Sequence, residues 1–186
     1  MAFGRMHLAC AVIAGCIATS ALSAELHVYR NPDYGFSVDL PGDIKCETNH
    51  PPNPNHGFKI PVSADAFVWV DAGSSDDQTL AGAAETEINV GWHGCTEVAR
   101  EPAHLAAKPA EKIMLSCPVG YDPGFDPGFA RRQRKRVLEI VALEAPPGLY
   151  NTVYTIGAAY PENNNVEQRK TTAVFDVVRR GFRFNE

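Results

Sequence analysis

Along most of this chain, apolar residues either alternate with polar ones or gather in short runs, which is the pattern of β-strands. Two runs flank the turn-forming sequence from Arg30 to Gly35, so they predict a β-hairpin. Two later runs flank Ala145-Pro146-Pro147-Gly148 and predict a second hairpin. Residues 46–58 contain three prolines and three asparagines, which predict an extended loop. The runs that predict strands are 26–29, 36–40, 66–70, 112–116, 137–143 and 150–159, and 182–184 predicts a last short strand or a docked tail.

Two other stretches have the spacing of amphipathic helices. Ser75 and Gln78 are spaced as a capping box, so we expect the first helix to begin there and to end near Gly91 or Gly94. The second helix is expected to begin within 161–165 and to end at Gly181, which follows two arginines. The apolar stripes are Leu80, Ala84, Ile88 and Trp92 in the first helix, and Val166, Ala173, Val174, Val177 and Val178 in the second.

Strand runs separated by two distant helices predict an α+β fold. We expect an antiparallel β-sheet of about six strands, covered on one face by both helices. Residues 25–186 number 186 − 24 = 162, which is enough for a single domain with its own hydrophobic core.

The first 24 residues have the composition of a secretory signal peptide. Arg5 precedes an apolar run from Leu8 to Ala18, and the following residues to Ala24 are small. This predicts cleavage near Ala24, a periplasmic or secreted protein, and no transmembrane span after cleavage. Ile13-Ala14-Gly15-Cys16 also resembles a bacterial lipobox, so lipidation at Cys16, which would anchor the protein to a membrane, is the alternative.

Charge excludes one class of partner. The leader holds one arginine and no acid, so residues 25–186 carry 17 − 1 = 16 basic and 22 acidic side chains, a net charge of −6. A general nucleic-acid binder needs an excess of cations to displace counterions from phosphates. We therefore expect no nucleic-acid partner.

Three cysteines remain after the leader, namely Cys46, Cys95 and Cys117. Thiols in an oxidising compartment tend to pair, and three leave one over. Cys95 follows the first predicted helix and Cys117 ends a predicted strand, which favours the disulfide Cys95–Cys117. Cys46–Cys117 is the next choice, and the sequence leaves the pairing open.

Two clusters contain residue types that are found in chemical sites. Cys46, His50 and His56 are zinc-ligand types, but the two histidines are six residues apart in a proline-rich stretch, whereas structural zinc sites use tighter pairs. His93 and Cys95 have the residue types of a nucleophile pair but lack an orienting third group. We therefore expect no catalytic residue, no metal and no cofactor.

A basic run near residue 133 is the candidate contact surface. Five cations fall within 131–136, and aromatic residues precede them. Exposed aromatic residues beside arginines are typical of protein interfaces, whereas a solvated strand edge is the alternative interpretation. The predicted partner-binding residues are Tyr121, Phe125, Phe129, Arg131, Arg132, Arg134 and Arg136.

Both ends of the chain resemble a known fold family. The sequence 29–41, which contains Asn31-Pro32 and Gly35-Phe36-Ser37 and ends at Pro41, resembles the opening hairpin of Mog1/PsbP-like domains. The sequence 175–184 resembles their closing helix and strand. This resemblance implies a Mog1/PsbP-like sandwich and a binding or accessory role, because those domains mostly serve as binding or accessory modules.

These features predict an exported, non-enzymatic binding or accessory protein of the bacterial envelope. An inhibitor or immunity protein that acts on an envelope partner is one concrete form. Two alternatives remain: an exported hydrolase with a Cys/His or zinc site, and a lipid-anchored structural protein of the envelope. The expected partner is an envelope or secreted protein, and the sequence leaves the oligomeric state open.

Overall fold

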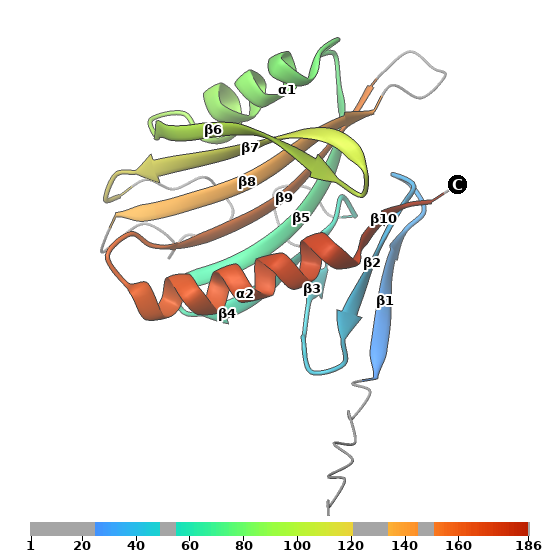
Figure 1. Ribbon diagram of the computed structural model, residues 1–186, viewed down its shortest axis with the longest axis horizontal. Coiled ribbons are helices and arrows are strands. Elements are labelled where there is room, and N and C mark those ends of the chain that lie inside the picture. Colours follow the sequence, from blue (N-terminus) through green and yellow to red (C-terminus); the bar gives the residue numbers. More distant parts are fainter. Residues whose placement is uncertain (1–24, 49–54, 121–133, 145–150, 186) are drawn as a thin grey trace, which may run out of the picture.

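A seven-stranded antiparallel sheet forms the centre of the structure, which is a computed structural model that describes residues 25–48, 55–120, 134–144 and 151–185 (Figure 1). Its strand order is β3-β4-β5-β9-β8-β7-β6. Every neighbouring pair is antiparallel. The strands are β3 (Glu47–Thr48), β4 (Phe58–Ser63), β5 (Ala66–Ser75), β6 (Thr96–Leu105), β7 (Lys108–Cys117), β8 (Lys135–Glu144) and β9 (Asn151–Pro161).

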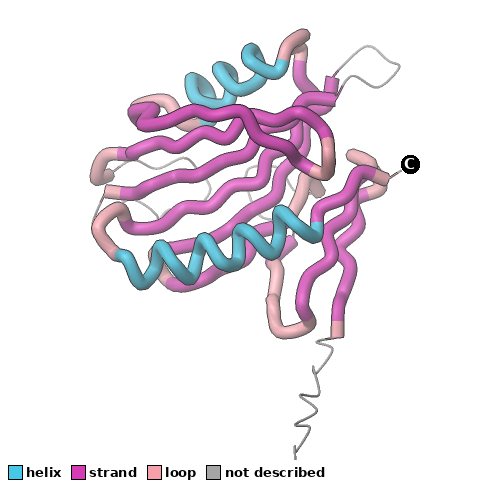
Figure 2. Tube along the Cα trace, viewed as in Figure 1, coloured by secondary structure: helices cyan, strands magenta, loops and turns pink. Residues whose placement is uncertain are grey.

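A smaller sheet joins the two ends of the described chain. It has the order β1-β2-β10, with β1 at Leu26–Asn31, β2 at Phe36–Pro41 and β10 at Phe182–Phe184 (Figure 2). The predicted first hairpin and the short last strand are both present. Gly35, with φ of +63°, supplies the left-handed backbone conformation that the turn between β1 and β2 requires.

The two helices lie on opposite faces of the large sheet. Helix α1 (Leu80–Thr86) runs into a π-helical turn, η1 (Glu87–Gly91), and packs on β7 and β8. Helix α2 (Asn165–Gly181) packs on β9, β5, β4 and on β2 of the small sheet (Figure 1). The expectation that both helices cover one face is therefore wrong, because alternate side chains of each central strand are buried on both faces.

Each face has its own hydrophobic core. Val68, Val70 and Ile156 face α2 and the small sheet, whereas Trp69 and Ala159 face α1 and Trp92. Gly157 lies opposite Trp69 in the register of β5 and β9, and a Cβ atom at Gly157 would stand 2.0 Å from the indole ring. Glycine is therefore required where the indole crosses β9.

The described residues form ten strands, whereas the sequence predicts about six. The missed strands are β3, β4 and β6, and the predicted 46–58 loop contains all of β3 and the first residue of β4. Strand β6 is charged and mostly exposed, and β4 and β6 contain Pro61 and Pro102. Strand β6 is an edge strand, and among the described residues β3 pairs only with Phe58 and Lys59 of β4, which leaves Pro61 unpaired on that side. Edge positions tolerate prolines and charges, so such sequences lack the apolar alternation of a strand with a buried face.

The helix ends differ in how well the sequence places them. Helix α1 is capped by Thr79, whose Oγ1 accepts a hydrogen bond from the Gly82 N–H at 3.0 Å, and not by Ser75 as predicted. Ser75 belongs to β5, paired with Asn151, so its hydroxyl is not at the helix end. Helix α2 begins after Asn164, which caps it, and ends at Gly181, both as expected. In the described part of the chain, neither helix has the length and apolar character needed to cross a membrane.

Candidate functional site

A groove of about 500 Å³ lies between α2 and the face of the large sheet that α2 leaves partly open. Helix α2 packs mainly on strands at the β4 side, while β7 and β6 form the opposite edge (Figure 1). The sheet therefore continues past the helix and forms one wall of the groove. We call this hollow the α2 groove, and its lining residues are Ala103, His104, Lys112, Leu138, Ile140, Thr172, Phe175, Asp176 and Arg179.

The floor of the α2 groove is apolar and rigid. Leu138 and Ile140 alternate along β8 and point toward α2, and Phe175 meets them from the helix. All three are at most 6% exposed, so packing fixes their positions.

The rim of the α2 groove carries charges of both signs. Lys112 Nζ lies 2.7 Å from Glu101 Oε1, and Arg179 Nε lies 3.8 Å from Asp176 Oδ1. These pairs are partly exposed, so each is worth little to stability and remains available to exchange partners. An apolar floor with a few polar groups at its edge is the usual construction of a binding cavity.

A second hollow continues the α2 groove along the helix. It shares Thr172 and Asp176 with the groove and extends toward Asn165 at the start of α2. The other residues that line it are Gln168, Arg169 and Ala173. A bound segment could therefore follow the helix for several turns.

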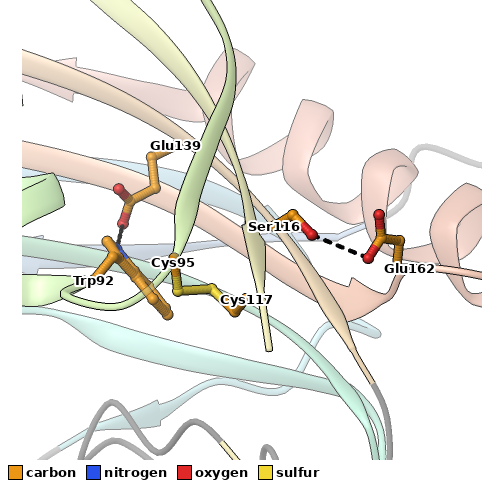
Figure 3. Close-up of a disulfide and its surroundings, with 6 residues drawn as sticks. All are labelled: Trp92, Cys95, Ser116, Cys117, Glu139 and Glu162. Atoms are coloured by element: carbon orange, nitrogen blue, oxygen red, sulfur yellow. Dashed lines mark hydrogen bonds between the residues drawn. A yellow bond between two sulfur atoms is a disulfide. The ribbon is translucent and has the colours of Figure 1, made fainter. Parts of the chain in front are cut away.

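The predicted basic run divides between solvent and the interior. Lys135 is fully buried, and its Nζ donates to the Asp65 carbonyl oxygen at 2.8 Å. Arg136 forms an ion pair with Glu162, which also accepts a hydrogen bond from Ser116 Oγ at 3.1 Å (Figure 3). Arg134 is exposed. Lys135 and Arg136 thus have structural partners, and only Arg134 of the described cations of this run faces solvent.

The other predicted contact residues lie outside the described residues. They are Tyr121, Phe125, Phe129, Arg131 and Arg132. Their part in partner binding remains a prediction. Arg134, which follows this segment, lies beside Glu162, whose N–H donates to the Arg134 carbonyl at 3.0 Å.

Of the three candidate zinc-ligand residues, the structure describes His56 and Cys46, and both make other contacts. His56 Nε2 lies 2.9 Å from the Tyr34 hydroxyl, and burial lowers the pKa of His56. Cys46 is a free thiol packed against the core, and burial raises its pKa. His50 lies outside the described residues. Within the described ranges, no group of three or more Cys, His, Asp or Glu side chains is arranged to hold a metal ion.

A cluster of three carboxyl groups lies at α1 and η1, in which Glu139 is buried and Asp71 and Glu87 are partly buried. Glu139 is fully buried in β8, and its Oε1 accepts a hydrogen bond from Trp92 Nε1 at 2.7 Å (Figure 3). Its Oε2 has no hydrogen-bond partner among the described residues. Burial, followed by repulsion from Glu87, raises the pKa of Glu139 well above its usual value. Burial likewise raises the pKa of Glu87 to about 7 and that of Asp71 to about 6.

A disulfide joins Cys95 to Cys117 beside this cluster, with an S–S distance of 2.03 Å (Figure 3). It is the pair that the sequence favours. Cys95 follows Trp92 and η1, so the bond ties the end of the α1 segment to the end of β7. His93 and Cys95 therefore do not form a nucleophile pair, because the sulfur is already bonded.

Sequence reasoning missed the α2 groove and the carboxyl cluster. The groove residues come from three strands and a helix, so only the tertiary arrangement brings them together. Glu139 does leave a signal, since it is the one charged residue in the apolar run 137–143. A single acid in a strand buried on both faces is expected to need a specific partner, which here is Trp92.

No family model and no curated protein matches this chain. Solved structures match it along most of its length. Cyanobacterial PsbP (CyanoP) from Synechocystis aligns with a TM-score of 0.50 and 15% identity over 92% of this chain and 98% of its own. LpqN, involved in cell envelope biogenesis of Mycobacterium tuberculosis, aligns with a TM-score of 0.50 and 12% identity over 87% of this chain and 91% of its own.

A third solved structure, the Ran-binding protein Mog1p of Saccharomyces cerevisiae, aligns with a TM-score of 0.47 and 10% identity over 87% of this chain and 96% of its own. The resemblance seen at the two ends of the sequence is confirmed at the level of the fold. The chain has the PsbP/Mog1 fold.

Proposed function

We propose that this chain is an exported, non-enzymatic binding or accessory protein of the bacterial envelope, and that its α2 groove holds a short segment of a protein partner. The observation that carries the proposal is the groove itself. Leu138, Ile140 and Phe175 form an apolar floor, and charged pairs stand at its rim. A partner segment with an apolar side chain flanked by polar or charged residues fits this construction.

The proposal of export is based on the leader and on the cysteines. Strand β1 begins at Leu26, so cleavage near Ala24 leaves every described strand intact. The disulfide Cys95–Cys117 fits an oxidising compartment. Lipidation at Cys16 is the alternative route of export, and labelling with a palmitate analogue distinguishes the two: label that is lost in Cys16→Ala supports lipidation, and unlabelled protein supports simple cleavage.

The accessory role is supported by the fold. LpqN shares this fold and is described as involved in cell envelope biogenesis. The fold alone does not fix an activity, because unrelated functions recur on one fold. The groove and the leader together favour an envelope partner, and an inhibitor or immunity protein against an envelope toxin is one form of such an accessory.

The test is a photocrosslinker placed inside or outside the α2 groove. A crosslinking amino acid at Thr172, which lines the groove, is compared with one at Arg180, which is exposed on the same helix and does not line it. We expect a discrete adduct with one envelope protein from position 172 and none from position 180. Equal adducts from both positions, or none from either, would overturn the proposal.

A second variant separates binding from folding. Thr172→Trp should fill the groove and weaken capture of the crosslinked partner about tenfold, which corresponds to about 1.4 kcal/mol. Arg180→Trp adds the same side chain outside the groove and should leave capture unchanged. Both proteins should keep the melting temperature of the parent, because neither position is in the core.

A further inference from the structure

Strand β1 is the outer strand of the three-stranded sheet. It pairs with β2 on one side, and no described strand pairs with it on the other. Figure 1 shows β1 at the outside of the small sheet, away from the large one. Its second edge is therefore open to another strand in the described part of the molecule.

The register shows which backbone groups point outward. The Gly42 N–H donates to the Glu25 carbonyl at 2.6 Å, and Glu25 stands one position before Leu26, which is opposite Pro41. Residues of an antiparallel pair alternate between hydrogen-bonded and non-hydrogen-bonded positions. Leu26, Val28 and Arg30 therefore turn their N–H and C=O groups away from β2 toward the open edge.

The side chains of the same three residues are also exposed. Leu26 is 61% exposed and Val28 is 43% exposed, and Arg30 is exposed beside them. They alternate with His27, Tyr29 and Asn31, which are more buried on the inner face. Open backbone groups and exposed apolar side chains thus coincide on one strand.

Strand β1 lacks the features that protect the edge strand β6. Strand β6 has a register shift between Glu97 and Ala99, contains Pro102, and carries Arg100 in ion pairs with Glu85 and Glu97. Bulges, prolines and charges are the usual means of preventing edge pairing. Strand β1 has a continuous register with β2 and no proline.

The sequence of β1 is complementary to itself in one antiparallel register. A two-fold axis at Val28 places Val28 opposite Val28 of a second copy and Leu26 opposite its Arg30. Arg30, the one charged side chain of β1, then lies against an aliphatic residue and not against another arginine. All three outward residues form hydrogen-bonded pairs in this register, which gives about six backbone hydrogen bonds.

We propose that β1 is a self-association edge, at which two copies of this chain pair their β1 strands antiparallel about Val28 and form one continuous six-stranded sheet. The α2 groove lies on another part of the molecule, so this pairing leaves the groove open in both copies. The inference is independent of the proposed partner.

The experiment measures the molar mass of the purified protein by sedimentation over a wide range of concentration. The parent should shift from monomer to dimer as its concentration rises. Val28→Pro removes the outward N–H of residue 28, which makes no hydrogen bond to β2. Leu26→Lys places a cation opposite Arg30 of the second copy. Each variant should weaken dimerisation at least about tenfold. Val166→Lys, at a valine 52% exposed on α2, is the matched control and should dimerise as the parent does.

Crosslinking decides the register. In a Cys46→Ser background, Val28→Cys should form a disulfide-linked dimer under mild oxidation, because the two positions face each other across the axis. Val98→Cys, at a valine that is 52% exposed on β6, should not form a disulfide-linked dimer. A protein that is monomeric at every concentration, or a dimer that forms equally in Val28→Pro and Leu26→Lys, would overturn the proposal. If Val28→Pro fails to fold, the cysteine pair still gives the answer.

Discussion

The two faces of the large sheet are closed in different ways. On the α2 face, a helix of 17 residues and the small sheet bury a continuous set of aliphatic and aromatic side chains. On the α1 face, a helix of seven residues and its π-helical turn cover a smaller core that contains buried carboxyl groups and ends at a disulfide. The longer helix buries more apolar surface and leaves a groove, whereas the shorter one needs a covalent bond.

This difference separates two sources of stability. A helix of seven residues is too short to be stable by itself, so α1 depends on what it packs against. Its buried residues are Ala83 and Ala84, which bury little area. The Cys95–Cys117 disulfide and the Trp92–Glu139 hydrogen bond are therefore expected to contribute more to the stability of the α1 face than any polar contact contributes to that of the α2 face.

The largest expected effect is on the α2 face. Phe175→Ala removes a ring that is 2% exposed, and we expect the free energy of unfolding to fall by about 3–5 kcal/mol. Val166→Ala on the same helix, at a side chain 52% exposed, is the control and should change it little. Urea denaturation measures both. A small loss in Phe175→Ala would show that the α2 face does not rest on apolar packing.

The next effect is on the α1 face. The double variant Cys95→Ser/Cys117→Ser opens a loop with a sequence separation of 22 residues, and we expect a loss of about 3 kcal/mol. Cys46→Ser, which removes the free thiol, is the control. Hydrogen exchange should show the loss of protection concentrated in α1, η1 and β6. An equal loss of protection on both faces of the sheet would show that the disulfide does not act mainly on the α1 face.

A pH dependence comes from the buried carboxyl groups. Their raised pKa values mean that the folded state binds protons more tightly than the unfolded state, so the stability that these groups contribute is fully present below the ordinary carboxyl pKa of 4.5 and is lost as pH rises through about 7. Glu139→Gln keeps an acceptor for Trp92 and cannot ionise. We expect the variant to match the parent near pH 4 and to be more stable by about 1–3 kcal/mol at pH 8.

Urea titrations at several pH values measure this effect. Glu144→Gln is the control on the same strand, because Glu144 is partly exposed and pairs with Lys108. If Glu139→Gln and the parent keep the same stability at pH 8, then Glu139 does not act as a buried acid in the folded protein.

The smallest effect concerns the basic run. Arg136→Gln breaks the ion pair with Glu162 and should lower the free energy of unfolding by about 1 kcal/mol or less, since both side chains are 19% exposed. Arg134→Gln should leave stability unchanged and, if the predicted contact surface is correct, should weaken capture of the partner. If Arg136→Gln weakens capture of the partner and Arg134→Gln lowers stability, then Arg136 and not Arg134 faces the partner.

Local sequence was sufficient for some elements and not for others. The β1–β2 hairpin depends on turn residues between two apolar runs, and α2 has a capping asparagine and a terminal glycine, so both were predictable. Strands β4 and β6 pair with the strands that follow them in the sequence, β5 and β7, and this pairing overrides the prolines and charges that they contain. Thr79 and Ser75 are both capping residue types, and only the length of β5 decides between them.

The candidate site was less predictable than the fold. The sequence of the basic run predicts a single exposed surface. In the structure, strand alternation buries Lys135 and turns its neighbours to the other face. The α2 groove exists because of where α2 crosses the sheet, which no local pattern specifies. The disulfide was the easiest feature to predict from the sequence, because three cysteines allow few pairings.

The position of β10 has a consequence for how the protein is made. The middle strand of the small sheet, β2, needs the first strand of the described chain on one side and the last on the other. Phe182 of β10 stacks on Phe36 with ring centroids 5.3 Å apart, so the core under α2 is incomplete until residues 182–184 have been synthesised. Contacts between such distant residues form late in folding. The small sheet, and the core that it helps to close, therefore forms only after nearly all of the described residues have been made.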